Sequence, residues 1–267
     1  MADDLVPDDL WERIAPLLPA RPPRRHRFPG RKPVDDRVAP AGIVYVLCTG
    51  VAWADVPAER IGCSGVTCRR RLRDWTEAGV WPRLHAALPA ELRSAGLLGM
   101  DDCSIDGSRA LKGGAHTGPS PVDRARPGSK HHVIVDRHGI PLAVSLTGGN
   151  RHDVTQLMPL LDAIPRIKGL RGRPLHRPRR LFADRGYDFD TYRRLIRKRG
   201  ITPKIARRGA PHGSGLGKTR WVVERTFAWL HQFKRLRIRY EIRADLHQGL
   251  LELACTIICL RRLPTAF

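Results

Sequence analysis

The sequence lacks any apolar run long enough to cross a membrane. Although 42% of its 267 residues are hydrophobic, the longest apolar stretch, residues 250–260, is shorter than the roughly 20 residues that a spanning helix needs. The chain starts MADDLVPDDLWERI, which is acidic and has no basic segment before an apolar one, so we expect no signal peptide. These absences predict a cytoplasmic protein without a membrane partner.

Metal-binding cysteine patterns are also missing. None of the six cysteines forms a Cys-x2-Cys pair, and no His-x3-His pair lies on a helix pattern, so we do not expect structural zinc. A reducing compartment disfavours disulfides. Three of the cysteines lie in apolar runs and are interpreted as small core residues: Cys48, Cys255 and Cys259.

Acidic residues are scarce. The chain has 48 Lys and Arg against 26 Asp and Glu, which gives a formal net charge of +22. A charge of this size in a chain that can fold around a core indicates a polyanionic partner. Nucleic acid is the first candidate, and it implies association with the nucleoid; an anionic membrane is the second. A protein that is merely basic is the remaining alternative.

Residues 1–95 have helical patterns throughout. Ser64 is a plausible helix N-cap after a Gly-containing turn, and Cys68, Leu72 and Trp75 form one apolar face of the helix that follows it. This arrangement is typical of a helix-turn-helix, in which an apolar seam holds a basic helix against phosphates. A solvated charged face is the alternative interpretation. The basic face consists of Arg69, Arg70, Arg71 and Arg73.

From about residue 100 the pattern changes to short β-branched runs that end at Gly, Asp or Asn. We expect a hairpin that turns at His138 and Gly139, two further strands, and helices over residues 153–164, 188–199 and from 220 onward. This order predicts an α/β mixed sheet flanked by helices. The Gly- and Pro-rich residues 109–130 are expected to form a long basic loop. We therefore predict a helical DNA-binding domain over residues 1–95 and a second domain over residues 96–267.

Two carboxylates are expected at strand ends. Asp106 follows Ser104 and Ile105, and Asp184 follows Leu-Phe-Ala. Ligands of open α/β sheets gather at the carboxyl ends of strands, so both positions suit chemistry. Asp before Gly is also a common turn signal, and for either residue alone the turn is the favoured interpretation on composition.

Glu224 is the single acid within residues 220–240, which are rich in arginine and lysine. At 100° per residue it lies opposite the apolar stripe of this helix and shares its face with Arg220, His231 and Arg235. One interpretation is a surface pair with Arg220. The other makes Glu224 the third carboxylate of a site for Mg²⁺ or Mn²⁺, where two ions would serve phosphodiester chemistry.

These residues resemble the DDE-class transposases of bacterial insertion sequences, particularly the insertion-sequence-five family. The matching stretches occur in the family's order over nearly the whole chain: YVLCTGVAW, RRLRDWTEAGVW, IDGS, KGGAHTGPSPVDRARPGSKHH, LTGGNRHD, ADRGYD and RWVVERTFAWLHQFKRLRIRY. Each stretch alone is a weak signal, whereas the ordered set is specific.

The resemblance implies a ribonuclease-H-like core in which Asp106, Asp184 and Glu224 are the catalytic acids and bind two Mg²⁺ or Mn²⁺ ions. It also implies an endonuclease that cuts double-stranded DNA at the element's terminal inverted repeats and joins the 3′-hydroxyl ends to target DNA, as a homodimer on DNA. The residues expected to bind DNA are Arg69, Arg70, Arg71, Arg73, Lys130, Arg220, His231, Lys234 and Arg235.

The chain departs from the family pattern at two places. In the helical signature Tyr-x2-Arg-x3-Glu-x6-Lys, Gly217 replaces the Tyr and His231 replaces the Lys. The segment after Asp106 is two residues shorter than in close relatives of the family. The alternative function is therefore a catalytically impaired relic that only binds the ends of the element.

Overall fold

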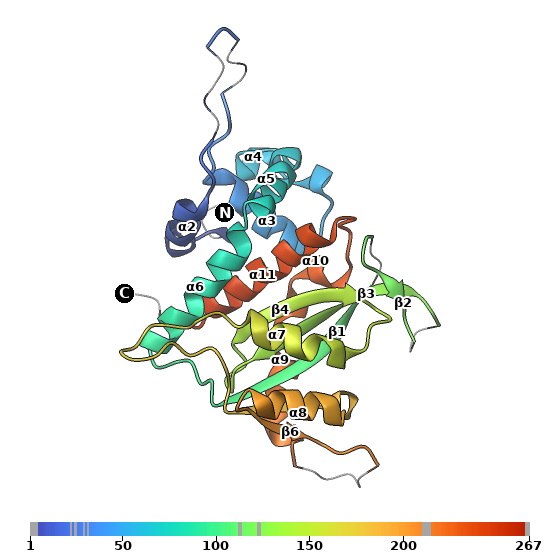
Figure 1. The fold of residues 1–267 in the computed structure, drawn as a ribbon. Coiled ribbons are helices and arrows are strands. Elements are labelled where there is room, and N and C mark those ends of the chain that lie inside the picture. The colour runs from blue at the N-terminus through green and yellow to red at the C-terminus, as the bar shows by residue number, and fades with distance from the viewer. Residues whose placement is uncertain are drawn as a thin grey trace.

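The computed structural model describes residues 5–21, 23, 26–28, 30, 32–111, 114–121, 124–209 and 215–264. Figure 1 shows a group of N-terminal helices above a pair of long helices, α6 and α11, and a sheet below them. Helices cover both faces of the sheet. Within the described residues no helix is long and apolar enough to cross a membrane.

The N-terminal region is helical, as predicted. Its elements are α2 (Asp8–Ile14), η1 (Ala15–Leu17), α3 (Val38–Thr49), η2 (Trp53–Asp55), α4 (Ala58–Ile61), α5 (Gly65–Glu77) and α6 (Val80–Ser94). The Ser64 hydroxyl accepts a hydrogen bond from the Thr67 amide at 3.3 Å and caps α5. Gly62 has the left-handed conformation that ends α4. The turn between α4 and α5 and the start of α5 therefore follow from local sequence signals.

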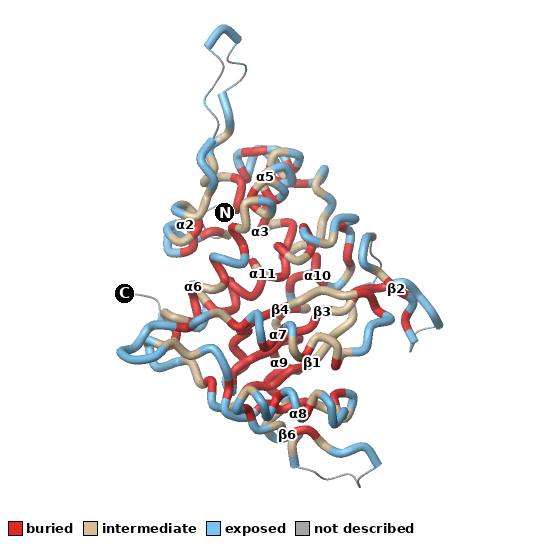
Figure 2. The backbone as a smooth tube through the Cα atoms, viewed as in Figure 1, coloured by how far each residue is buried: buried red, intermediate tan, exposed pale blue. Residues whose placement is uncertain are grey.

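The N-terminal helices share their core with C-terminal helices. α9 (Gly217–Gln232), α10 (Lys234–Arg237) and α11 (Ala244–Leu260) contribute side chains to one buried cluster that also contains Leu47, Leu72 and Trp81. Figure 2 shows this buried interior as a continuous zone along α6 and α11 into the sheet. Movement of the helix-turn-helix relative to the sheet would therefore expose apolar surface.

The sheet is mixed, as the sequence predicts. Its strands are β1 (Asp102–Leu111), β2 (Gly118–Pro119), β3 (Pro127–Val135), β4 (Pro141–Gly148), β5 (Arg180–Ala183) and β6 (Thr202–Ile205). β3 pairs antiparallel with β1 and β4, while β5 pairs parallel with β1 and β6. Three antiparallel strands followed by two parallel ones confirm the predicted ribonuclease-H-like fold class.

Different helices cover the two faces of the sheet. Val133 and Val144 pack with α9 and α11 on one face. On the other face Ile105 and Ile134 pack with α7 (Leu157–Ala163) and α8 (Asp190–Lys198). η3 (Asp153–Gln156) precedes α7, and η4 (Arg185–Tyr187) follows β5. Neighbouring residues of β1 therefore face opposite helices.

The prediction of a loop over residues 109–130 was wrong at both ends. β1 continues to Leu111, and β3 begins at Pro127, with β2 paired to its first residues. The Gly and Pro content suggested irregular structure, but Arg109, Ala110 and Leu111 find backbone partners on β3. The hairpin predicted at His138 and Gly139 is confirmed between β3 and β4. The shortened segment after Asp106 is thus part of a regular strand.

Candidate active site

Asp106 lies in the middle of β1, which corrects its predicted place at a strand end. It does lie where the pairing with β5 ends, because the register matches Ser104 with Phe182 and β5 stops at Ala183. Two more residues along the same register bring Asp106 level with Asp184, which directly follows β5 as predicted. The two carboxylates are therefore neighbours at an edge of β1 that β5 leaves open.

Both oxygens of Asp106 have partners. Oδ1 accepts a hydrogen bond from the Gly107 amide at 2.8 Å, and Oδ2 accepts one from Arg220 at 3.2 Å. Burial nevertheless raises the pKa of Asp106 to about 6, against the lowering effects of the Gly107 amide and Arg220. The negative charges of Asp184 and Asp153 also raise it. Burial is therefore the main reason that the proton of Asp106 is held more tightly than usual.

Asp184 is held by the turn that follows β5. Its Oδ1 accepts a hydrogen bond from the Gly186 amide at 2.9 Å, which caps η4. The next aromatic residue, Tyr187, is buried, and its hydroxyl has no hydrogen-bond partner among the described residues. Burial raises the pKa of Tyr187 well above its usual range, and the charges of Asp106, Asp153 and Asp184 raise it further. The Tyr187 phenol is therefore held neutral beside the acidic part of the site.

Glu224 lies on α9, as predicted, and its side chain is exposed. One turn earlier on the helix, Arg220 contacts Asp106. Two turns later, His231 Nε2 lies 3.2 Å from the Ser108 hydroxyl. At 100° per residue these three side chains share one face of α9. Because Arg220 and His231 both contact β1, Glu224 lies on the face of α9 that is turned toward the open edge.

The donor set suits a hard divalent cation, because Asp106, Asp184 and Glu224 offer only oxygen ligands. Asp184 has one oxygen outside its turn hydrogen bond. Within the described part of the chain, however, no group of three or more His, Cys, Asp or Glu side chains is gathered closely enough to bind a metal ion. The chemistry of the residues fits the metal, while Arg220 occupies one oxygen of Asp106.

Known proteins match both parts of the chain. Residues 99–259 match the family model described as "Transposase DDE domain", which covers more than half of the chain. Residues 6–85 match the model described as "Putative transposase of IS4/5 family". The chain is a DDE transposase of the IS4/5 family. It is therefore an enzyme of the class that cuts and joins DNA, and this family generally uses divalent metals.

Individual relatives agree with this family. A putative transposase for insertion sequence element IS402 from Burkholderia cepacia is 64% identical over 150 residues, which are 56% of this chain and 71% of that protein. A 16.2 kDa protein of the same element is 51% identical over 45% of this chain and 84% of its own length. A chain of the Mos1 strand transfer complex aligns over 89% of this chain and 81% of its own length at 11% identity. The TM-score of 0.27 is too low to support a structural conclusion.

The basic residues of α5 divide into two groups. Arg69 and Arg70 are exposed and form no hydrogen bond or ion pair with any described residue. Arg71 contacts Asp36 at 3.0 Å, and Arg73 contacts Asp74 at 2.8 Å. Of the four α5 arginines that were predicted to bind DNA, the first two therefore have unoccupied guanidinium donors.

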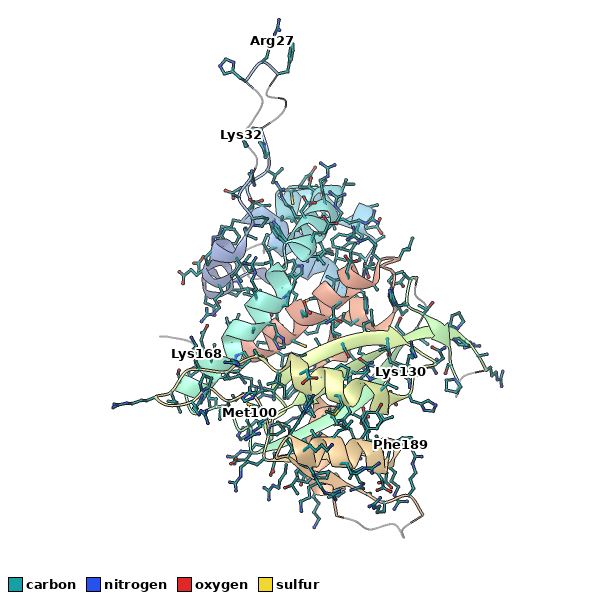
Figure 3. The ribbon with its side chains drawn as sticks, in the orientation of Figure 1. Arg27, Lys32, Met100, Lys130, Lys168 and Phe189 are labelled. Carbon is teal, nitrogen blue, oxygen red and sulfur yellow. The ribbon has the colours of Figure 1, made fainter. Side chains whose placement is uncertain are left out.

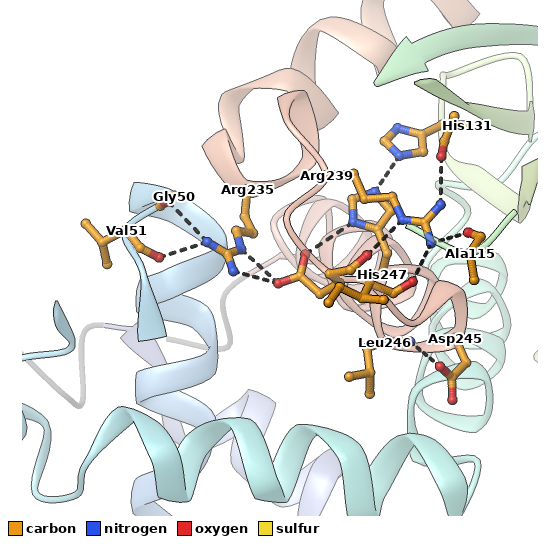
Figure 4. Close-up of polar contacts among 12 residues, drawn as sticks. Gly50, Val51, Ala115, His131, Arg235, Arg239, Asp245, Leu246 and His247 are labelled. Atoms are coloured by element: carbon orange, nitrogen blue, oxygen red, sulfur yellow. Dashed lines mark hydrogen bonds and ion pairs between the residues drawn. The ribbon is translucent and has the colours of Figure 1, made fainter. Parts of the chain in front are cut away.

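The prediction that Arg235 binds DNA was wrong. Its guanidinium is buried, pairs with Glu241 at 2.7 Å and donates to the carbonyls of Gly50 and Val51. Figure 4 shows this pair at the junction of the N-terminal helices with the segment before α11. α9 ends at Gln232, so the helical spacing that placed Arg235 beside Glu224 does not extend to it. Arg235 holds the structure together, and its guanidinium is buried away from any phosphate.

The remaining predicted DNA contacts differ in exposure. Lys234 is exposed. His231 is half-buried, and burial, together with the charge of Arg237, lowers its pKa, which disfavours the charged form that a phosphate would bind. Lys130 is mostly covered and contacts Asp153 at 3.0 Å. In the sequence Asp153 belongs to the family segment LTGGNRHD and also fits a helix N-terminus, so its contact with Lys130 was not predicted.

Proposed function

We propose that the chain cuts DNA at the ends of its insertion sequence and joins the resulting 3′-hydroxyls to target DNA. The observation that supports this proposal most directly is the neighbouring position of Asp106 and Asp184 at the open edge of β1. A phosphodiester can approach this edge because β5 has left the sheet there. Family membership supports the general class of reaction, and the site supports its location.

Asp106, Asp184 and Glu224 would hold two Mg²⁺ or Mn²⁺ ions, which would polarise the scissile phosphate and lower the pKa of the attacking hydroxyl or water. Arg220 contacts Asp106 and is placed to contact a phosphate once that carboxylate has another partner. Its planar guanidinium suits two oxygens of one phosphate. Glu224 has the exposure and helix face required to complete the donor set.

The N-terminal helices would recognise the terminal inverted repeats. Arg69 and Arg70 lie in the first half of α5, and N-terminal residues of a recognition helix commonly contact base edges in the major groove. Lys234 would add a phosphate contact near the site. Two ends must be cut and joined together, so a homodimer on DNA is the expected assembly.

The deciding experiment is Mg²⁺-dependent nicking of a duplex that carries the element's inverted repeat, with Glu224→Gln as the test variant. The exposed Glu12→Gln, on α2, is the matched control. We expect Glu224→Gln to bind the duplex normally and to lose cleavage by at least about 10³-fold, as removal of an essential catalytic group does. Full cleavage by Glu224→Gln would contradict the assignment of Glu224. Removal of Mg²⁺ with a chelator should abolish nicking and leave binding intact.

A DNA-binding relic without cleavage is the second candidate. This candidate is favoured because the described residues contain no group of three metal-binding side chains that are close enough to share an ion. Specific binding without nicking, in Mg²⁺ and in Mn²⁺, by the wild-type chain would support the relic. Nicking that depends on Glu224 would exclude it.

A further inference from the structure

Lys130 is the most constrained lysine near the site. Its Nζ donates hydrogen bonds to Asp153 Oδ1 at 3.0 Å and to the Arg151 carbonyl at 2.9 Å, and its side chain is 15% exposed. An ammonium group has three N–H donors. Two are occupied by fixed acceptors, so one donor remains and its direction is set. Lys130 is thus oriented before any ligand binds.

Asp153 lies close beside the strand at Gly107. A Cβ at this position would lie 2.7 Å from Asp153 Oδ1, closer than real contacts, and 3.2 Å from His132 Nδ1, so Asp153 would have to move. His132 supports the arrangement from β3: its Nε2 lies 2.7 Å from the Thr147 hydroxyl and its Nδ1 lies 3.6 Å from Asp153 Oδ1. His132 is fully buried, and Nδ1 has no hydrogen-bond partner among the described residues.

The Lys130–Asp153 pair flanks Asp106 from the opposite face of β1. Asp106 faces α9, where Arg220 contacts it, whereas Gly107 faces η3 and Asp153. η3, which carries Asp153, packs against η4 directly after Asp184, so the pair lies close to the edge that β5 leaves open. A phosphate at this edge would have Arg220 on one face of β1 and the Lys130–Asp153 pair on the other.

We propose that Lys130 binds a non-bridging oxygen of the DNA phosphate at this edge, at or directly beside the scissile bond, and that Asp153 is the positioning residue that orients it. This inference rests on the proposed function. Gly107 is then required because any side chain there would displace Asp153. In the Asp106-Gly107 pair, the first residue would supply a catalytic acid on one face of β1, and the second would leave room for Asp153 and Lys130 on the other face.

The test compares Lys130→Met, Asp153→Asn and the double variant on duplexes in which single phosphates at and beside the cleavage site are replaced by neutral methylphosphonates. Cleavage rates are measured after DNA is bound, and dissociation constants are measured in Ca²⁺. We expect Lys130→Met to slow cleavage about 10- to 100-fold, as the loss of a charged hydrogen bond does. On one methylphosphonate stereoisomer the loss should fall below about 3-fold, because the partner charge is already absent.

The double variant tests whether Asp153 acts through Lys130, because its rate shows whether the two single losses add. Asp153→Asn should slow cleavage roughly 3- to 30-fold, and the double variant should be no slower than Lys130→Met, because Asp153 acts through Lys130. Lys130→Arg keeps the charge and should recover part of the rate. Lys168→Met is the matched control: Figure 3 shows Lys168 at the opposite end of the sheet from Lys130, and its rate should be unchanged.

Several outcomes would overturn the proposal. These are a wild-type rate for Lys130→Met, an equal loss on every methylphosphonate duplex, or additive losses in the double variant. Equal melting temperatures of the variants verify folding. If the wild-type chain binds but does not cut, the proposed cleavage fails. The effects of Lys130→Met and of the methylphosphonates are then compared through the dissociation constants in Ca²⁺. Non-additive effects on binding support the contact between Lys130 and the phosphate, and additive effects overturn it.

Discussion

Two helical segments, α5 and the α9–α10 region, are both rich in arginine but place these arginines in different surroundings. On α5, Arg69 and Arg70 extend into solvent without a described partner. In α9–α10, Arg220 contacts Asp106 and Arg235 is buried against Glu241. The partners of the second group come from elsewhere in the chain, from β1 and from the segment before α11. Clustered positive charge therefore identifies neither a DNA contact nor a structural ion pair until the carboxylates are located.

Removal of the buried guanidinium should have the largest effect on stability. Arg235→Ala leaves the buried Glu241 without its guanidinium partner, with only His247 Nδ1 near it at 3.5 Å among the described residues, and removes donors from two carbonyls. We therefore expect a loss of about 3–5 kcal/mol in the free energy of unfolding. Urea denaturation measures it. Arg237→Ala, an exposed arginine of the same helix, should change stability by less than about 0.5 kcal/mol. Equal stability of the Arg235→Ala and Arg237→Ala variants would show that the buried ion pair does not set Arg235 apart from an exposed arginine.

Glu252, a carboxylate that is shielded from water and has no described arginine beside it, should destabilise the folded chain when it ionises. Burial raises the pKa of Glu252 on α11 to about 7, although Gln248 donates a hydrogen bond to it at 2.9 Å. The unfolded chain loses this proton near the ordinary Glu pKa, so the folded state binds more protons in between. The wild type should therefore lose stability as pH rises from about 4 through about 7.

Glu252→Gln removes this penalty. At pH 8 the variant should be more stable than the wild type by roughly 1–3 kcal/mol, and the difference should vanish near pH 4.5. Thermal or urea unfolding at the two pH values provides the measurement. A pH-independent difference would show that packing, and not ionisation, controls this position.

The exposed arginines of α5 should affect DNA binding and leave folding unchanged. Replacing Arg69 and Arg70 by Ala should weaken binding to the inverted repeat by about 10-fold per residue at physiological salt. The slope of log K against log salt should become shallower by about 0.9 for each phosphate that the variant no longer neutralises. Binding measured by fluorescence anisotropy over a salt series is the readout. An unchanged slope would show that α5 is only a solvated face.

Arg71→Ala should have the smallest effect. Its partner Asp36 lies 3.0 Å away, and both side chains are 21% exposed, so the pair contributes about 0.2–1 kcal/mol. DNA affinity should change by less than about 2-fold, because the guanidinium is already occupied. A loss of affinity equal to that of Arg70→Ala would place Arg71 on the DNA-binding face after all.

Elements with local signals were predictable. Ser64 capped α5, the hairpin turned at Gly139, and Asp184 followed its strand, because capping hydrogen bonds, turn residues and periodicity act within a few residues. The strand through Arg109 was not predictable from its Gly- and Pro-rich context, since the pairing with β3 supplies its backbone partners. The assignments of Asp106, Asp184 and Glu224 as metal ligands remain predictions.

The sequence by itself determined the family, the fold class and the positions of the local signals, because motif order and periodicity are properties of the linear chain. Only the tertiary structure decided which charges are occupied. It placed Arg235 in the interior, brought Arg220 to Asp106, and set Asp153 and Lys130 beside Gly107. The physical reason is that an ion pair depends on the distance and burial of both partners. In this chain the partners of the functional charges are up to 114 residues apart.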